Sequence, residues 1–371
     1  MQDSRILIIG AGIGGLTAAI ALGKKGFKVE MIEKDPAWSV YGVGIIQQSN
    51  VIRAMHSLGI LEDYLEAGFG FDNVDIFSPG GQHLATVPSH RLVEGYPANV
   101  GISRRALQKV LGDCARQAGS EIHLGVTATE INNQAEKVEV TFSDSRKQFY
   151  DMVIGADGLY STTREQIFAE APEPEFTGQG VWRYNFNRPE DIISLHAYAG
   201  PIGMGLVPIS RSLMYLYMTT PEPGNPRYNR DELASAMQDK LGNAPAAIAA
   251  YVSHITDNES VVYKPLEWLF LGGDWYRNRV VLIGDAVHAT TPHLGQGAGL
   301  AIEDAIVLAE EIARASEPHA AFTAYQRRRF ERCNYIVEKS REIGESQLGL
   351  RPPVDQAAAT SDMFRVVSAP I

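Results

Sequence analysis

The chain has 371 residues, of which 45% are hydrophobic and 21% are charged. This composition is typical of a globular protein, and the length predicts one large domain or two closely packed ones. The 33 Lys and Arg residues against 44 Asp and Glu residues leave a net charge of −11, which argues against nucleic acid and anionic membranes as partners.

Two further features bear on where the protein works. Cys114 and Cys333 are the only cysteines and lie far apart, so we expect neither a disulfide scaffold nor a structural zinc site, and a cytoplasmic protein. The apolar run ILIIGAGIGGLTAAIAL begins almost at Met1. Because glycines interrupt it and no cationic segment or cleavage site flanks it, we interpret it as strand, turn and helix, not as a signal peptide or membrane span.

The N-terminal segment predicts a βαβ unit. Arg5–Ile9 is a short apolar strand, a helix is expected over about residues 14–25, and Lys28–Glu33 is the second strand. The turn between the first strand and the helix reads GAGIGG, in the context that makes a GxGxxG motif meaningful. Its backbone N–H groups at the helix N-terminus would favour a pyrophosphate.

The glycines of this turn and the end of the second strand predict a dinucleotide site. Gly10 permits the tight turn, Gly12 lets the backbone approach a pyrophosphate, and Gly15 lets helix and strand pack closely. Glu33 has the spacing of a carboxylate that binds an adenosine ribose. These features do not separate NAD from FAD. The predicted contacts are Gly10, Gly12, Gly14, Gly15, Glu33 and Lys34.

The middle of the chain has a different pattern. Residues 137–150 alternate as in a hairpin, and residues 151–155 return to a buried strand. Residues 176–263 are rich in proline and aromatic residues, with strand candidates GVWRYNF, SLHAYAG, GMGLVPI and LMYLYMT. We predict an antiparallel sheet inserted before the parallel sheet resumes at residues 279–283. After Pro318 a helix is expected to about Gly344, with Arg327, Arg328 and Arg329 on a solvated or interdomain surface.

Two later segments, VIGADGLYSTTR and VVLIGDAVHATTPHLGQGAGLAIEDA, again run from a strand into a loop. Asp157 or Asp285, just beyond the carboxyl end of its strand, is expected to point into the ligand crevice. Three such features in one chain fit an extended ligand better than a compact one. The chain has no second strand–GxGxxG–helix unit, which disfavours a reductase with a separate NADPH domain.

The order of these motifs resembles that of the flavin-dependent aromatic hydroxylases, the single-component FAD monooxygenases of the para-hydroxybenzoate and salicylate hydroxylase type. The matching segments are GAGIGG with Glu33, GVGIIQQSNVIRAMHSLGI, SRRALQ, IGADGLYSTTR and RVVLIGDAVHATTPHLGQGAGLAIEDA. The resemblance implies an α/β fold with a Rossmann-like FAD-binding domain of the GR2 type, an inserted antiparallel-sheet substrate domain and C-terminal helices. We therefore predict a discontinuous FAD-binding domain over residues 1–75, 98–178 and 263–317, a substrate domain over residues 76–97 and 179–262, and a C-terminal helical segment over residues 318–371.

The same resemblance implies roles for particular residues. Arg104 is expected at FAD phosphate or ribityl oxygens, Asp157 at the family's DG motif for FAD and NAD(P)H, and Asp285 at the ribityl chain. The loop that lines the flavin would include Pro292, Gly295, Gly297 and Ala298. The chain departs from relatives at Ser49-Asn50 and Gly299, which puts the geometry of the flavin loop in doubt. It also carries Gly203 and Met204 where urate-hydroxylating relatives have an arginine, so a strongly anionic substrate is not expected to be clamped at that point.

The resemblance further implies a reaction. NADH or NADPH would bind transiently and reduce FAD, O2 would add at the flavin C4a position, and the hydroperoxide would hydroxylate an aromatic or N-heteroaromatic small molecule. The family implies a monomer or homodimer. The alternatives are a non-oxygenating flavoprotein of the same fold, such as a double-bond reductase or halogenase, and a nucleotide-binding sensor.

Candidate catalytic residues are Tyr215, Tyr217, His293 and Pro292. Tyr215 and Tyr217 share one face of a predicted strand, and a phenol can orient a substrate hydroxyl. His288 and His293 are five residues apart across a proline, so no metal site is predicted, and no GxSxG motif supports a hydrolase. His288 is expected to be a hydrogen-bonded loop residue.

Two assignments stay open at this stage. Trp182 and Arg183 face opposite sides of their strand, so one of them could reach the pocket, and core packing or a surface ion pair is an equal alternative for each. The amides of Gln47 and Gln48 would either polarise a bound ring or satisfy backbone groups.

Overall fold

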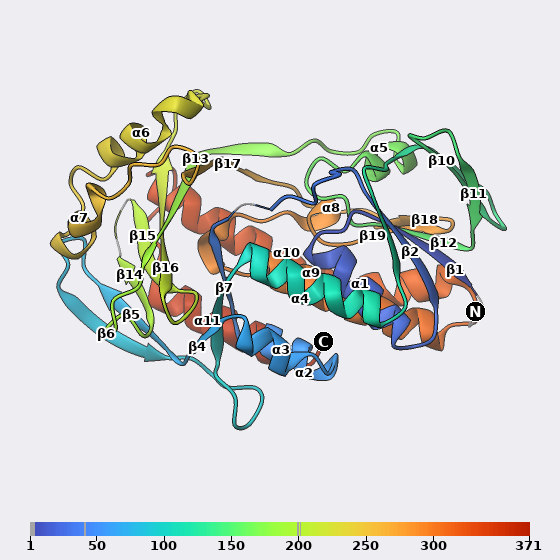
Figure 1. Cartoon of the computed structure of the whole chain (residues 1–371), viewed down its shortest axis with the longest axis horizontal. Coiled ribbons are helices and arrows are strands. Elements are labelled where there is room, and N and C mark those ends of the chain that lie inside the picture. The colour runs from blue at the N-terminus through green and yellow to red at the C-terminus, as the bar shows by residue number, and fades with distance from the viewer. Residues whose placement is uncertain (1–3, 41, 199, 201) are drawn as a thin grey trace.

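Two large sheets organise the chain, and Figure 1 shows them toward opposite ends of an elongated molecule. The computed structural model describes residues 4–40, 42–198, 200 and 202–371. The long helix α10 (Pro318–Gln347) packs on α9 (Gly297–Arg314) beside the first sheet and reaches β13 of the second.

The first sheet has the order β18-β19-β12-β1-β2-β8, and its strands are parallel except for the edge strand β18. Its members are β1 (Arg5–Ile9), β2 (Lys28–Glu33), β8 (Glu121–Leu124), β12 (Met152–Gly155), β18 (Tyr276–Arg277) and β19 (Val280–Leu282). The predicted α/β fold with a discontinuous parallel sheet is confirmed. The central strands β1, β12 and β19 are apolar apart from Arg5, and Ile6, Leu7 and Ile8 are fully buried.

Helices cover this sheet and bring its loops together at the carboxyl ends of the strands. α1 (Ile13–Gly23) follows the glycine turn and packs between α4 (Arg104–Gln117) and α9. The remaining helices are α2 (Ser49–Ser57), α3 (Leu61–Glu66), α5 (Thr162–Ile167), α6 (Leu233–Lys240), α7 (Ala246–Val252), α8 (Asp285–His288) and α11 (Gln356–Ser368), with 3-10 turns at Arg230–Glu232 and Pro292–Leu294.

The second sheet has the order β17-β13-β16-β15-β14-β5-β6. Its strands are β5 (Asn73–Phe77), β6 (His83–Pro88), β13 (Glu175–Asn187), β14 (Leu195–Tyr198), β15 (Gly203–Pro208), β16 (Leu213–Pro221) and β17 (Val262–Trp268). It is antiparallel as predicted except that β14 runs parallel to β5. Strands β5 and β6 come from a segment far earlier in the chain, so the sheet is not built from hairpins alone.

Side chains of β13 and β16 alternate between the two faces of this sheet where the two strands pair. Trp182, Leu216 and Met218 pack in an apolar cluster with α6 and α7. Arg183 and Tyr217, which are paired across β13 and β16, lie on the opposite face. Trp182 thus belongs to the core, and Arg183 is the member of the pair that faces the first sheet.

Three of the predicted segment boundaries lie within strands. The boundaries at residues 76, 179 and 263 fall inside β5, β13 and β17, and all of these strands belong to the second sheet. Two smaller sheets complete the fold. The predicted hairpin of residues 137–150 gains a third strand, and its members are β9 (Ala128–Asn133), β10 (Val138–Phe142) and β11 (Lys147–Tyr150). The other sheet contains β3 (Gly44–Gln47), β4 (Phe69–Phe71) and β7 (Asn99–Ser103).

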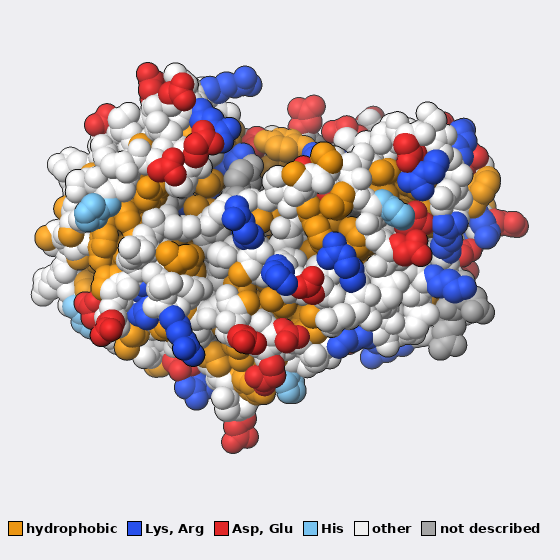
Figure 2. All heavy atoms as spheres, viewed as in Figure 1, with side chains coloured by type: hydrophobic (Ala, Val, Ile, Leu, Met, Phe, Trp, Pro, Cys, Tyr) orange, Lys and Arg blue, Asp and Glu red, His pale blue; other side chains and the backbone are white. Residues whose placement is uncertain are grey.

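The arginine run of α10 also differs from expectation. Only Arg327 is exposed, whereas Arg328 is half-buried against α9 and Arg329 is fully buried. Elsewhere the surface is mixed, and acidic and basic side chains are interspersed over the face shown in Figure 2. No helix among the described residues is both long and apolar enough to cross a membrane.

Candidate active site

A cavity of about 1150 Å³ lies between the two sheets. This volume exceeds that of a pocket for one drug-sized ligand, so it has room for an extended cofactor and a second molecule. One side is formed by the loops at the carboxyl ends of β1, β12 and β19, and the other by the inward face of the second sheet. The lining includes Gly12, Gly14, Arg104, Gly158, Asp285, Pro292, His293, Gly295, Gly297 and Ala298, with Arg183, Tyr215 and Tyr217 from the sheet.

The glycines of the turn after β1 differ in what surrounds them. Some lie too close to neighbouring backbone to carry a side chain, and one borders open space. A Cβ at Gly10, whose φ is +101°, would lie 2.5 Å from the Ala156 carbonyl oxygen, and one at Gly15 would lie 2.0 Å from the Gly10 carbonyl oxygen. A Cβ at Gly12 would meet nothing within 4 Å. Gly10 and Gly15 therefore serve the fold, whereas the space over Gly12 is the space that a closely approaching ligand backbone would fill.

Glu33 holds this turn in place. One carboxylate oxygen accepts a hydrogen bond from the Ala11 N–H at 3.0 Å, and the other accepts one from the Asp35 N–H at 3.0 Å. The Trp38 indole donates to the Ala11 carbonyl at 3.0 Å. Lys34 is exposed beyond the end of β2 and does not line the cavity, so its predicted cofactor contact has no support from its position.

The two candidate aspartates have different surroundings. Asp157 does not line the cavity. Its carboxylate is directed to the start of α5, where it accepts hydrogen bonds from the Ser161 hydroxyl at 2.5 Å and the Thr163 N–H at 2.9 Å. Its neighbour Gly158 lines the cavity instead. Asp285 does border the cavity, and the protein around it raises the pKa of its carboxyl by removing it from bulk water. Of the pair, only Asp285 is placed to meet a ligand.

Arg164 is a residue that the sequence analysis missed. It is buried and donates to the Leu159 carbonyl at 2.9 Å and the Ala286 carbonyl at 3.1 Å. Leu159 lies in the loop that follows β12, and Ala286 lies in α8, which follows β19. Arg164 thereby fixes this loop and α8 relative to each other, and a basic residue soon after a DG pair is the signal that could have found it.

The loop that precedes α9 is held by amides. Asn50 donates to the Gln296 side chain at 3.0 Å, Gln48 donates to the Leu294 carbonyl at 3.3 Å, and Gln296 donates to the Gln48 amide oxygen. A Cβ at Gly299 would lie 2.9 Å from the Gln296 amide oxygen. Asn50 and Gly299 therefore both lie against the Gln296 amide, so the two departures from the family pattern, at Ser49-Asn50 and at Gly299, are in contact with the same side chain. The Gln48 amide bonds the protein itself and also borders the cavity.

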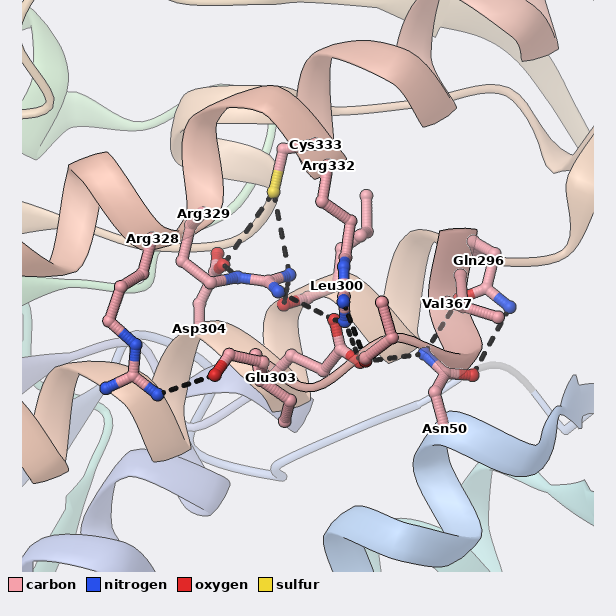
Figure 3. Close-up of polar contacts among 12 residues, drawn as sticks. Asn50, Gln296, Leu300, Glu303, Asp304, Arg328, Arg329, Arg332, Cys333 and Val367 are labelled. Carbon is pink, nitrogen blue, oxygen red and sulfur yellow. Dashed lines mark hydrogen bonds and ion pairs between the residues drawn. The ribbon is translucent and has the colours of Figure 1, made fainter. Parts of the chain in front are cut away.

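A buried ionic network lies directly behind this loop, and Figure 3 shows how α9 and α10 supply most of it. Asp304 accepts from His288 at 2.5 Å, from the Gly284 N–H at 2.9 Å and from Arg329 at 2.8 Å. Arg329 also donates to Glu303 at 2.7 Å. Burial opposes the charge on Asp304, but the His288 and Arg329 cations outweigh it and hold its pKa well below the usual range. His288 lies in helix α8, not in a loop.

This network also brings together a trio that the sequence spacing did not suggest. Ligand-type atoms of His288, Asp304 and Cys333 lie within 4.8 Å of one another. The Arg329 guanidinium already contacts both Asp304 and the Cys333 sulfur, at 2.8 and 3.6 Å. Because a cation already occupies this position, the geometry supports an ion-pair network that anchors α9 rather than a metal site.

The substrate side of the cavity is built from side chains. Tyr215 and Tyr217 line it with ring centroids 6.2 Å apart, and neither hydroxyl has a hydrogen-bond partner within the described part of the chain. The Tyr215 ring packs on Gly44, where a Cβ would lie 2.3 Å away. Removal from bulk water raises the pKa of both phenols, so they remain protonated donors at neutral pH.

His293 borders the cavity as a fixed neutral ring. Its Nδ1 lies 2.8 Å from the Thr291 hydroxyl and its Nε2 lies 3.1 Å from the Gln347 amide oxygen. Burial lowers the pKa of His293 to about 4 despite the Gln347 contact. Nε2–H therefore donates to Gln347 and Nδ1 accepts from Thr291. Gln347 was not identified from the sequence because it lies 54 residues later, at the end of α10.

FAD fits the arrangement of these residues. The open space over Gly12 and the N-terminus of α1 suit a pyrophosphate, and the cavity is also lined by Asp285, Arg104 and residues of the segment from Pro292 to Ala298. Arg104 begins α4 directly after its N-cap, Ser103.

Comparisons with known proteins agree with this fit. A family model described as FAD binding domain matches residues 3–340. The chain is 31% identical over 355 residues to the putative FAD-dependent monooxygenase YetM of Bacillus subtilis, covering 95% of this chain and 96% of the relative. It is 31% identical to the 2-heptyl-3-hydroxy-4(1H)-quinolone synthase of Pseudomonas aeruginosa, over 91% of this chain and 88% of the relative.

Two further matches extend the picture. The chain is 30% identical to the 6-hydroxynicotinate 3-monooxygenase of Bordetella bronchiseptica, over 91% of both chains. Its fold matches that of Klebsiella pneumoniae HpxO complexed with FAD and uric acid, with a TM-score of 0.85, 24% identity and coverage of 98% of this chain and 92% of the other. The chain belongs to the FAD-binding domain family and is an FAD-dependent monooxygenase.

Proposed function

We propose that this monooxygenase hydroxylates an aromatic or N-heteroaromatic small molecule, with NADH or NADPH as a transient reductant and O2 as the oxygen source. The observation that carries the proposal is one continuous cavity with a cofactor-shaped half and a substrate half walled by Tyr215, Tyr217 and His293. The ring substrates named for the relatives, a quinolone and a hydroxynicotinate, support the same class. We further propose a cytoplasmic monomer or homodimer.

The roles of the protein follow from the site. FAD, when bound, supplies the chemistry that transfers electrons from NAD(P)H and activates O2. The loop from Pro292 to Ala298 and the inward face of the second sheet enclose the reacting centre and limit access of water. Pro292 contributes shape to this enclosure, since it has no N–H to donate.

We assign orientation of the substrate to the two phenols. Tyr215 and Tyr217 are protonated and point donors into the cavity, so they suit an oxygen on the substrate ring. His293 is neutral with both ring nitrogens engaged, so its role is to position neighbouring groups and present a polar edge. It accepts a substrate proton only if the Thr291 hydroxyl rotates away from Nδ1.

A direct test combines cofactor content with product analysis. The full chain is purified, its flavin is identified, and NADH and NADPH oxidation is measured with a panel of phenols, hydroxypyridines and hydroxyquinolines. We expect at least one panel member to accelerate oxidation and to gain one oxygen atom. Stoichiometric peroxide with every compound, and no hydroxylated product, would instead favour the non-oxygenating alternative.

A further inference from the structure

Gln347 brings an uncharged side chain to the substrate half of the cavity. It is the last residue of α10 and borders the cavity beside Gly203 of β15. A Cβ at Gly203 would lie only 3.0 Å from Nε2 of Gln347. The Gln347 carboxamide therefore lies where a side chain at position 203 would point, and no charged clamp is expected at this position from the sequence.

Two donors fix the orientation of this carboxamide. Its Oε1 accepts a hydrogen bond from the Gln179 side-chain N–H at 2.9 Å and another from Nε2–H of His293 at 3.1 Å. The Thr219 hydroxyl lies 3.4 Å from the same oxygen. Gln179 and Thr219 are buried on β13 and β16, so the oxygen is held against the sheet. The amino group of Gln347 must then face away from these donors.

The amino group of Gln347 is a donor that the protein does not use. In the part of the chain that the structure describes, every hydrogen bond of the Gln347 side chain is made by Oε1 and none by Nε2. Nε2 is nevertheless absent from the buried polar atoms that lack a partner, so it is accessible. An accessible N–H on the wall of a ligand cavity is available to an acceptor on the ligand.

The groups that hold the carboxamide carry no charge. Burial lowers the pKa of His293 to about 4, so its ring is neutral at physiological pH, and Gln179 and Thr219 are uncharged. The adjacent lining from β14 and β15 is apolar and includes Leu195, Ala197 and Val207. An anion placed against Gln347 would lose hydration without meeting an opposite charge there, whereas a neutral carbonyl oxygen needs only one donor.

We propose that Gln347 positions the substrate by donating an N–H of its carboxamide to a neutral ring carbonyl, and that it thereby selects ring lactams and ring ketones. The carbonyl oxygen would lie beside Gly203, and the rest of the ring would pack on the apolar lining of β14 and β15. This inference rests on the proposed function and names the substrate group that the site recognises.

The test uses pairs of ring compounds that differ by one carbonyl group. 2(1H)-Quinolone and quinoline, and 1-indanone and indane, are titrated into the FAD-loaded full chain without NADH or NADPH, and binding is followed by the change in flavin absorbance. The ratio of the two dissociation constants in a pair gives the carbonyl preference and cancels the contribution of the ring. For at least one pair we expect Q347L to lower this preference about tenfold, with less than a twofold change for the compound without a carbonyl.

A second variant keeps the test decisive if Q347L folds poorly. Q347L leaves the donors of His293 and Gln179 without their acceptor, whereas Q347E keeps that oxygen and replaces only the amino group. Q347E should therefore lose the carbonyl preference by at least the same factor. The matched control is Q117L at the exposed end of α4, which should keep the wild-type preference. Flavin content and melting temperature identify the variants that are folded.

Two results would overturn the inference. One is a carbonyl preference that stays within twofold of the wild type, for both pairs, in a folded variant of Gln347. The other is a wild-type protein that binds neither 2(1H)-quinolone nor 1-indanone. Because binding is measured without turnover, failure of hydroxylation would reject the proposed function and leave this result standing.

Discussion

The two halves of the cavity are built by different means. On the cofactor side the surface is mostly backbone, and glycines, Glu33, Arg164 and the Asp304 network hold it in position. On the substrate side the surface consists of side chains on a regular sheet. Tyr215, Tyr217 and Arg183 are neighbours there, and none of them has a hydrogen bond or ion pair with a described residue. Changes on the first side should therefore affect stability and FAD affinity, and changes on the second should affect turnover.

The largest effect is expected in the ionic network. Replacing Asp304 by Asn leaves the buried His288 and Arg329 cations without their shared carboxylate. We expect D304N to lower the free energy of unfolding by about 3–5 kcal/mol, measured by urea denaturation. The matched control is R327A on the exposed side of the same arginine run, with a change within about 0.5 kcal/mol. If the two variants had similar free energies of unfolding, the ionic network would not stabilise the fold as stated here.

A pair of glycine variants separates fold from ligand on the cofactor side. G15A places a Cβ 2.0 Å from a carbonyl oxygen and should cost about 2–3 kcal/mol of stability in the apoprotein. G12A should leave the apoprotein unchanged and weaken FAD binding by about tenfold or more. Thermal melting of the apoprotein and FAD titration measure the two quantities. A loss of apoprotein stability in G12A would show that Gly12 is needed by the chain itself.

The two aspartates should show opposite effects. D285N removes a charge that borders the cavity and should weaken FAD binding with little change in apoprotein stability. D157A removes the acceptor of the Thr163 N–H at the start of α5, where Ser161 remains as the N-cap, and should cost about 0.5–2 kcal/mol of stability. Its effect on FAD affinity should be smaller than that of D285N. The reverse order of FAD affinities would mean that the DG loop reorganises around the cofactor.

On the substrate side, phenol removal should spare the fold. Because neither hydroxyl bonds a described residue, Y215F and Y217F should change the free energy of unfolding by no more than about 0.5 kcal/mol. Each should lower kcat/KM by about tenfold, equivalent to the loss of one hydrogen bond of about 1.4 kcal/mol. Steady-state kinetics with the identified substrate measures this. Unchanged kcat/KM in both variants would place the substrate elsewhere.

The smallest effect concerns pH. The folded-state pKa of His293 is about 4, below its ordinary value of 6.5, so the folded protein resists a proton that the unfolded chain accepts. Its contribution to stability is therefore present above pH 6.5 and is lost as the pH falls toward 4. H293N should flatten this acid-side slope in urea denaturation at several pH values. The pH dependence of the wild-type turnover rate should show no inflection from His293 between about pH 5 and 8. An inflection in that range that is absent from H293N would contradict the conclusion that His293 stays neutral.

The sequence predicted the cofactor side better than the substrate side for a physical reason. Strand–glycine–helix spacing is local, so the turn over Gly12 and the position of Asp285 could be expected from short segments. Asp157 was misplaced because a carboxylate after a strand can also cap the next helix, and spacing alone does not distinguish the two.

Long-range contacts escaped prediction. Gln347 reaches His293 across 54 residues, and Arg329 meets Asp304 across 25, so no local pattern links them. The parallel pairing of β14 with β5 likewise joins segments more than one hundred residues apart. Period-two alternation did predict that Tyr215 and Tyr217 share a face, but only the packing of α6 and α7 determines which face is the core.

The source of the oxygen atom tests the central claim most directly. Once a substrate is identified, the reaction is run under oxygen-18 gas with NADH or NADPH, and the product is measured by mass spectrometry. The account predicts that each product molecule carries one oxygen-18 atom at a ring position. A product that carries only oxygen from water, or a product without added oxygen, would contradict it.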